Sequence, residues 1–408
     1  MSSFAIHVDA LTAPNANGIP GVSIAVLNAS GETLLQKTDG VTSLSRNASP
    51  ITDKSIFRLS SSTKIITAIA ALQCVERSQI TLDEPVTPWL PELKGKQIIS
   101  LASSTPATYG TTATLNSRPE FIFTDAKTEI TLRMLLTHTS GIGLDLLHPT
   151  LRAWRSSRNE APQAITGSAT ASWDMPLIFE PGSSWMYSAS YDAIGVLISR
   201  LNHTNLEDYM QQHIFAPLDL HNSTFFIKHK DKHEMLENLV ECVTRTKGGI
   251  LTPYPSPTDD NPAEAQGSGG LFTSIPDFTT ILHDLISTHS ILLKTETIHH
   301  LFTPQLQPST AQKQGFDQAR PLWSSLIGEL AQTTETDFGL GGLLVTSDSK
   351  SLGAVKGTLC WAGATGTFWM VNRERGVVAV CAMQIFPVSD TVALGLMQDF
   401  VREVWRVC

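Results

Sequence analysis

Several features that define common classes of protein are missing from this sequence. No apolar run reaches the roughly 18 residues of a membrane-spanning helix, so we expect none. The N-terminal stretch MSSFAIHVDALTAPNANG lacks the basic segment and the apolar core of a secretory signal. A net charge of −9 disfavours nucleic acid or an anionic membrane surface as a partner. These absences favour a cytoplasmic protein that binds neither membrane nor nucleic acid.

Cysteine is scarce, and no cluster of metal ligands stands out. The cysteines are odd in number and scattered without C-x-x-C spacing, which predicts reduced thiols: Cys74, Cys242, Cys360, Cys381 and Cys408. His299 and His300 are neighbours and cannot share a helical face, which favours a solvated pair over a metal site. We therefore expect neither a metal nor a cofactor.

Strand-like segments occur at both ends of a chain whose 41% apolar content is typical of a globular protein. Two β-rich runs within residues 21–40 flank a turn at Asn28–Gly31, which predicts a hairpin. Four apolar runs between residues 338 and 386 are typical of antiparallel strands. Helical patterns lie between the two groups. The prediction is an α+β fold, in which N- and C-terminal segments build one antiparallel sheet flanked by helices, with a helical insertion.

The chain is predicted to be one unit, residues 1–408, with two subdomains. Residues 1–95 and 266–408 form the sheet subdomain, and residues 96–265 form a mainly helical insertion with lid loops. Ser274 is an N-cap candidate for one helix, with Pro276 in its first turn. Other helices are predicted within 1–17, 57–77, 128–143, 190–201, 205–212 and 391–405. No strong pattern marks 94–127, 151–173 or 303–335, and 225–265 is predicted to be a mobile loop or lid.

Ser61 and Lys64 begin an apolar helical run, FRLSSSTKIITAIAALQCVER at residues 57–77. Positions three apart share a helix face, so the amine can lie beside the hydroxyl. A cation and the unpaired N–H groups of a helix N-terminus both favour the alkoxide form of the serine. The alternative is a common surface cap, because many Ser and Lys pairs have this spacing.

Two further motifs complete a possible site for acyl transfer. Tyr187, if it lies near Lys64, can exist partly as phenolate and take the proton from Ser61. Acyl transfer also needs two N–H donors aimed at the developing oxyanion. The Ser61 amide is one candidate, and an edge-strand amide such as that of Ala364, in the segment Trp361–Ala364, is the second. The alternatives are a packed tyrosine and a plain core strand.

The order of these motifs resembles that of class C β-lactamases, penicillin-binding proteins and family VIII carboxylesterases. There, S-x-x-K is followed by Y-x-N or Y-S-x and then by K-T-G or a W-G-G variant. The likeness extends over about residues 19 to 390. Further segments resemble the fungal acyltransferases of the lovastatin pathway: ALQCVER (Ala71–Arg77), LTHTSGI (Leu136–Ile142), His148-Pro149 and FGLGG (Phe338–Gly342).

The resemblance implies a β-lactamase/transpeptidase-like fold and a Ser61 acyl-enzyme, with Lys64 and Tyr187 moving the proton. It implies transfer of an acyl group from a thioester, on CoA or on the carrier domain of a polyketide synthase, to an alcohol of a polyketide-type secondary metabolite. One alternative is a carboxylesterase of the same fold. The other is a non-catalytic binding protein, which the intact motifs disfavour.

The chain departs from the penicillin-recognising pattern at three positions. Trp361 replaces the lysine of K-T-G, which removes the cation that would hold a β-lactam carboxylate. Ala189 replaces the asparagine of Y-x-N. Both changes favour esters or thioesters as substrates. Ala362 stands where glycine is usual and narrows the site, and the sequence Lys356-Gly357-Thr358 has the wrong order to serve as K-T-G.

Three other features of the sequence are possible parts of a site. His138 is predicted to end a helix and bond backbone rather than join a metal site or a triad. Ser23 lies in a G-x-S-x-A segment predicted as strand, so an α/β-hydrolase elbow is disfavoured. Aromatic residues lie in or beside the insertions and the motif strand, where, with Gly363, they can line a broad apolar acceptor pocket: Trp154, Trp173, Trp185, Trp323 and Trp361.

Overall fold

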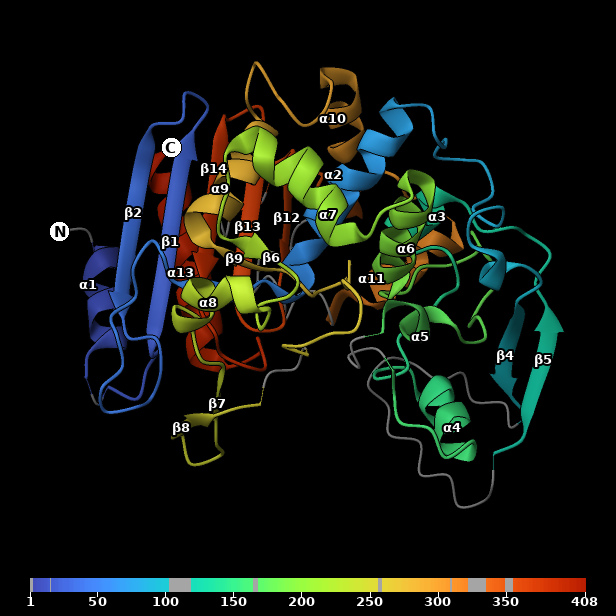
Figure 1. Ribbon diagram of the computed structural model, residues 1–408, viewed down its shortest axis with the longest axis horizontal. Coiled ribbons are helices and arrows are strands. Elements are labelled where there is room, and N and C mark those ends of the chain that lie inside the picture. Colours follow the sequence, from blue (N-terminus) through green and yellow to red (C-terminus); the bar gives the residue numbers. More distant parts are fainter. Residues whose placement is uncertain are drawn as a thin grey trace.

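Seven strands form the central antiparallel sheet, in the order β10-β11-β12-β13-β14-β1-β2 (Figure 1). The computed structural model describes residues 3–14, 16–102, 119–163, 168–255, 259–308, 310–321, 335–348 and 355–408. The strands of the sheet are β1 (Gly21–Asn28), β2 (Thr33–Gly40), β10 (Thr336–Phe338), β11 (Leu343–Val345), β12 (Thr358–Ala362), β13 (Thr367–Asn372) and β14 (Val377–Ala382).

This sheet joins the two ends of the chain. β1 pairs with β14 in a register that extends from Ser23 opposite Ala382 to Asn28 opposite Val377. β1 and β2 form the predicted hairpin. Every residue of β12, β13 and β14 is buried, and because neighbouring side chains point to opposite faces, both faces of the sheet must be covered. The prediction of one sheet from N- and C-terminal segments is confirmed.

Helices from both ends of the chain cover the sheet. α9 (Ile275–Asp284) packs on β14 and β1. α13 (Thr391–Val407) packs against β14 and against α1 (Ser3–Thr12), which also contacts β2. The Phe400 ring of α13 contacts Phe4 of α1 and Phe368 of β13. The predicted helices within 1–17 and near 391–405 are therefore present, and they share one apolar contact.

A helix buried on all sides lies between the sheet and the remaining helices. It is α2 (Thr63–Glu76), in which all residues from Thr63 to Cys74 are buried. α6 (Ser190–Asn202) packs against α2, and α3 (Leu132–Leu136) and α5 (Ala169–Trp173) pack against α6. Figure 1 shows α2, in blue, between the red strands of the sheet and the green helix α6. The start of α2 is therefore enclosed by elements from both parts of the chain.

Several elements lie in stretches where the sequence has no strong pattern. β4 (Gln97–Leu101) pairs with β5 (Phe121–Asp125), of which only Phe121 is partly buried. An exposed strand shows no alternation of apolar and polar residues, and this explains why it was missed. Also missed were α4 (Pro149–Ser157), α5, α11 (Ala311–Gln318), α8 (His233–Glu237) and the hairpin of β7 (Val243–Arg245) with β8 (Leu251–Pro253).

The remaining elements complete the layout without changing it. β3 (Ile56–Arg58), β9 (Phe272–Ser274) and β6 (Ser223–Thr224) form a small sheet, and α7 (Leu206–Met210) and α10 (Thr295–Leu301) are short helices. The division into a sheet subdomain and a helical insertion stays a prediction. All five cysteines are unpaired, as predicted. Over the described ranges, no helix has the length and apolar character needed to cross a membrane.

The cap of α9 gives a test of local stability. Ser274 occupies the predicted N-cap, and its Oγ accepts the Asp277 N–H at 3.2 Å. We predict that Ser274→Ala lowers the free energy of unfolding by about 1 kcal/mol in chemical denaturation. Thr310→Ala is the control, because Thr310 precedes α11 without a capping hydrogen bond from its side chain. Equal effects of the two substitutions would contradict the prediction.

Candidate active site

The hydroxyl of Ser61, the amine of Lys64 and the phenol of Tyr187 meet at one point. Ser61 lies in a 3₁₀ turn (Ser60–Ser62) that leads directly into α2. Tyr187 Oη donates to Ser61 Oγ at 2.6 Å, and Lys64 Nζ lies 3.4 Å from the same oxygen. Lys64 Nζ is also 4.7 Å from the centre of the Tyr187 ring. The serine is only partly buried, so a substrate can reach it.

The Lys64 amine has a second and shorter contact that the sequence did not reveal. Nζ donates to the carbonyl oxygen of Ser268 at 2.6 Å, and the lysine side chain is almost fully buried. Ser268 belongs to the glycine-rich segment Gly267–Gly270, which precedes β9 and α9. A buried amine needs polar partners, and this carbonyl supplies the closest one.

The backbone before Ser61 is held in an uncommon conformation. Ser60 has φ of 46°, in the left-handed region that few residues other than glycine adopt. Its Oγ lies 3.1 Å from Thr365 Oγ1, which donates to the Arg58 carbonyl at 3.0 Å. Gln384 Nε2 donates to the same carbonyl at 3.1 Å. These buried contacts tie the turn of Ser61 to the central sheet and hold the strained residue in place.

The second amide proposed for the oxyanion lies in a different setting from the one predicted. β12 is an interior strand between β11 and β13, and Ala364 lies in the turn after it, so the edge-strand prediction was wrong. A Cβ on Gly363 would come 2.2 Å from the Leu59 carbonyl oxygen, so this glycine lets the turn approach the Ser61 backbone. In the described part of the chain, neither the Ser61 nor the Ala364 N–H has an acceptor.

The His138 ring packs against the ring of Tyr187. The residue follows α3, and its ring centre lies 4.8 Å from that of Tyr187. Nδ1 accepts the Ser188 N–H at 3.3 Å and lies 3.0 Å from Ser188 Oγ, so the ring proton must be on Nε2. Burial, with the nearby charge of Lys64, holds the pKa of His138 well below 6.5. The histidine is therefore neutral and bonds backbone, as predicted.

A series of aromatic rings extends from the tyrosine. The Trp361 ring lies 5.4 Å from Tyr187 and 5.7 Å from Phe338, which in turn lies 5.8 Å from Trp185. Phe316 of α11 continues the series at 5.1 Å from Trp185. Of these, the sequence pointed to Trp361 and Trp185, while Phe338 and Phe316 were not recognised as neighbours of the site. The indole N–H groups of both tryptophans are buried and have no acceptor among the described residues.

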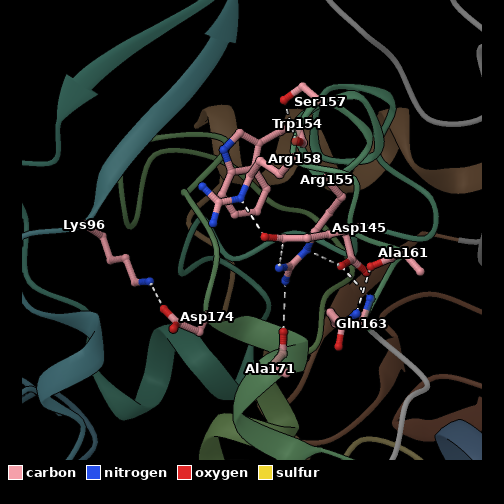
Figure 2. Close-up of polar contacts among 11 residues, drawn as sticks. Lys96, Asp145, Trp154, Arg155, Ser157, Arg158, Ala161, Gln163, Ala171 and Asp174 are labelled. Atoms are coloured by element: carbon pink, nitrogen blue, oxygen red, sulfur yellow. Dashed lines mark hydrogen bonds and ion pairs between the residues drawn. The ribbon is translucent and has the colours of Figure 1, made fainter.

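Trp154 belongs to another part of the molecule. Figure 2 shows it beside Arg155 of α4 and Arg158 directly after that helix, and their guanidinium carbons lie 5.0 and 5.1 Å from its ring centre. Arg155 also forms a buried ion pair with Asp145 at 3.0 Å. Trp154 packs in a small apolar cluster separate from the main core, so its part in acceptor binding stays a prediction. Trp323 lies outside the described residues.

The contact between the phenol and the serine can be tested by serine reactivity. We predict that Tyr187→Phe slows covalent modification of Ser61 by a fluorophosphonate probe by about 10²–10⁴-fold, because the group that exchanges a proton with the hydroxyl is lost. Thermal unfolding should change little, since the ring remains. Tyr254→Phe is the control, as Tyr254 stacks on Phe386 after β8. A rate near that of the unchanged protein would remove the tyrosine from the proton path.

Known proteins are similar to this chain in sequence and in fold. Residues 8–401 match the family model described as Beta-lactamase. Acyltransferase calJ of Penicillium decumbens is 34% identical over 377 residues, which cover 92% of this chain and 86% of that protein. Lovastatin esterase of Penicillium rubens is 30% identical over 395 residues, which cover 95% of this chain and 94% of that protein.

A solved structure gives the same result for the fold. Unliganded simvastatin synthase (LovD) from Aspergillus terreus has a TM-score of 0.84 at 26% identity, over 99% of this chain and 98% of that chain. The predicted β-lactamase/transpeptidase-like fold and the resemblance to lovastatin-pathway acyltransferases are thereby confirmed. The motifs, the fold and the family model agree over nearly the whole length, and the chain belongs to the beta-lactamase family.

Proposed function

We propose that this protein is a serine acyltransferase that moves an acyl group from a thioester to an alcohol through an acyl-enzyme on Ser61. The observation that carries the proposal is the double contact of Ser61 Oγ, with Tyr187 Oη at 2.6 Å and Lys64 Nζ at 3.4 Å. A serine hydroxyl is a weak nucleophile until a neighbouring base takes its proton. Tyr187 Oη and Lys64 Nζ both lie within hydrogen-bond distance of the Ser61 hydroxyl, where such a base must be.

In the first half-reaction, Ser61 Oγ attacks the thioester carbonyl carbon. In the reactive form of the pair, Tyr187 is a phenolate beside the Lys64 ammonium. The phenolate takes the hydroxyl proton of Ser61, the C–S bond breaks, and the phenol returns that proton to the leaving thiolate. The negative charge on the carbonyl oxygen is held by the Ser61 and Ala364 N–H groups, which have no acceptor in the described part of the chain. Losing one such donor costs about 10²–10³ in rate.

In the second half-reaction, an alcohol takes the place of the thiol. The Tyr187 phenolate takes the alcohol proton while the alcohol oxygen attacks the acyl-enzyme. The phenol then returns that proton to Ser61 Oγ as the bond to the acyl group breaks, and the new ester leaves. The rings of Trp361, Phe338 and Trp185 are almost fully buried and form the apolar core beside Tyr187.

The similar proteins support a secondary-metabolite alcohol as acceptor. Two of them are named as an acyltransferase and as simvastatin synthase. Trp361 at the K-T-G position leaves no lysine there to hold a carboxylate. As donor we propose an acyl thioester of CoA or of a polyketide synthase carrier domain, and as location the cytoplasm, where the five unpaired thiols stay reduced.

A carboxylesterase is the second candidate, because lovastatin esterase is 30% identical over nearly the whole chain. Both activities use the same acyl-enzyme. They differ only in whether water or an alcohol reaches it first, and therefore in how well the acceptor pocket excludes water.

The acyl-enzyme is tested by intact-protein mass after incubation with a short acyl thioester. We predict one added acyl group, mapped by peptide analysis to Ser61, together with release of thiol. Ser61→Ala should abolish both the added mass and all turnover, because no other described group lies in the same position. Ser30→Ala, on the exposed β1–β2 turn, should behave like the unchanged protein. Labelling that persists in Ser61→Ala would place the nucleophile elsewhere.

Product analysis distinguishes the two candidate activities. With a thioester donor alone, slow release of free acid is expected. Addition of a bulky polyketide alcohol should divert most of the acyl group to an ester and raise the rate of thiol release, because the alcohol then removes the acyl group faster than water. If acid remains the main product at saturating alcohol, the protein is an esterase.

A further inference from the structure

A buried carboxylate outside the proposed catalytic trio lies close to the site. Asp192, in the first turn of α6, is 1% exposed. One carboxylate oxygen, Oδ1, accepts the Ser268 N–H at 2.8 Å, and the other, Oδ2, accepts the hydroxyl of Ser172 on α5 at 2.8 Å. A carboxylate is removed from water at a large free-energy cost unless it is paired and hydrogen-bonded. Its presence here needs a reason.

Ser268 connects this carboxylate to the catalytic lysine. The N–H of Ser268 goes to Asp192, and its carbonyl oxygen accepts from Lys64 Nζ at 2.6 Å. Gly267, the residue before Ser268, is also held in place, because its carbonyl accepts from Thr67 Oγ1 at 2.8 Å. A Cβ on Gly267 would lie 2.5 Å from the Tyr191 carbonyl oxygen. The segment is therefore clamped between α2 and α6, with Lys64 bonded to the carbonyl of Ser268 and Asp192 to its N–H.

Burial and polar contacts have opposite effects on the pKa of the Asp192 carboxylate. Burial raises the pKa of Asp192 to about 6, while the hydrogen bonds from Ser268 and Ser172 and the charge of Lys64 act in the other direction. Two further titratable groups face Lys64 from neighbouring elements. Burial raises the pKa of Tyr191 well above 10, and burial with the charge of Lys64 lowers that of His138 well below 6.5, so both stay neutral near pH 6.

We propose that Asp192 is a positioning residue for acyl transfer: by holding Ser268, its carboxylate keeps Lys64 Nζ beside Ser61 Oγ and balances the charge of the buried amine. The inference rests on the proposed function of Ser61. Asp192 does not touch the reacting atoms. It acts through the backbone of Ser268, whose carbonyl oxygen accepts a hydrogen bond from the Lys64 amine.

Asp192→Asn removes the charge and keeps the shape. The amide oxygen can still accept the Ser268 N–H, and the amide nitrogen can donate to Ser172, whose hydroxyl can then turn to the Ala169 carbonyl at 2.7 Å. The measured quantity is the rate constant for acylation by a short acyl thioester. We expect a fall of about tenfold to hundredfold with little change in KM. The buried Lys64 amine loses the negative charge that balances it, and a neutral amide holds the Ser268 N–H less strongly than a carboxylate does.

The pH profile separates positioning from stability. In the unchanged protein, acylation should decrease as the pH falls through about 6, where Asp192 takes up a proton and loses its charge. Asp192→Asn should lack this acidic limb, since nothing is left to titrate. Ser172→Ala should move the midpoint of the limb to higher pH, because the hydroxyl holds the pKa of the carboxylate down.

Asp284→Asn is the matched control. Asp284 is also a buried carboxylate that accepts a serine hydroxyl, from Ser290 at 2.6 Å, and a backbone N–H, from Ile291 at 2.7 Å. It ends α9, and its variant should keep both the rate and the acidic limb. The proposal is overturned if Asp192→Asn acylates at the unchanged rate. It is equally overturned if the rate falls but the acidic limb remains. Failure of the unchanged protein to form an acyl-enzyme at all would instead refute the proposed function.

Discussion

The structure depends on keeping one ammonium group inside the protein. Lys64 is 4% exposed and lies on a helix that is buried on every side. A buried charge is tolerated only where polar groups replace water. Here they are the Ser268 carbonyl, the Ser61 hydroxyl and the face of the Tyr187 ring. Ser268 and Tyr187 come from distant parts of the chain, so the fold must be nearly complete before the amine is accommodated.

The central sheet and the helices around α6 contribute different groups to the site. The segment before α6 supplies Tyr187, and α6 supplies Asp192, which holds the Ser268 N–H. The sheet supplies the turn after β12, which the Thr365 hydroxyl ties to the Ser60 hydroxyl and to the Arg58 carbonyl. Neither part holds a complete site. Their relative position, fixed by the packing of α2 between them, sets the distance between the serine and its partners.

How much the sequence could predict depended on how local the signal was. Ser61 and Lys64 share a helix turn, and the buried strands are continuous apolar runs, so spacing and composition were enough for both. The position of Ala364 was predicted wrongly because β12 ends at Ala362 and pairs on both sides with the strands next to it in the chain. This makes β12 an interior strand and leaves Ala364 in the turn to β13. Ser268 was missed because it acts through its backbone. Asp192 was missed because an acidic residue in a first helical turn is ordinarily explained by the helix dipole.

The pairing of β1 with β14 has a consequence for how the protein is made. The β1–β2 hairpin leaves the ribosome early, whereas β14 is almost the last element to be synthesised. In the interval, one side of β1 carries unpaired backbone N–H and C=O groups, to which strands of other nascent chains can add. The turn at Gly363 is also late, so the growing chain carries its reactive serine without the second amide. Newly made protein therefore passes through a long inert and aggregation-prone period, and its yield should depend on synthesis temperature and chaperone supply.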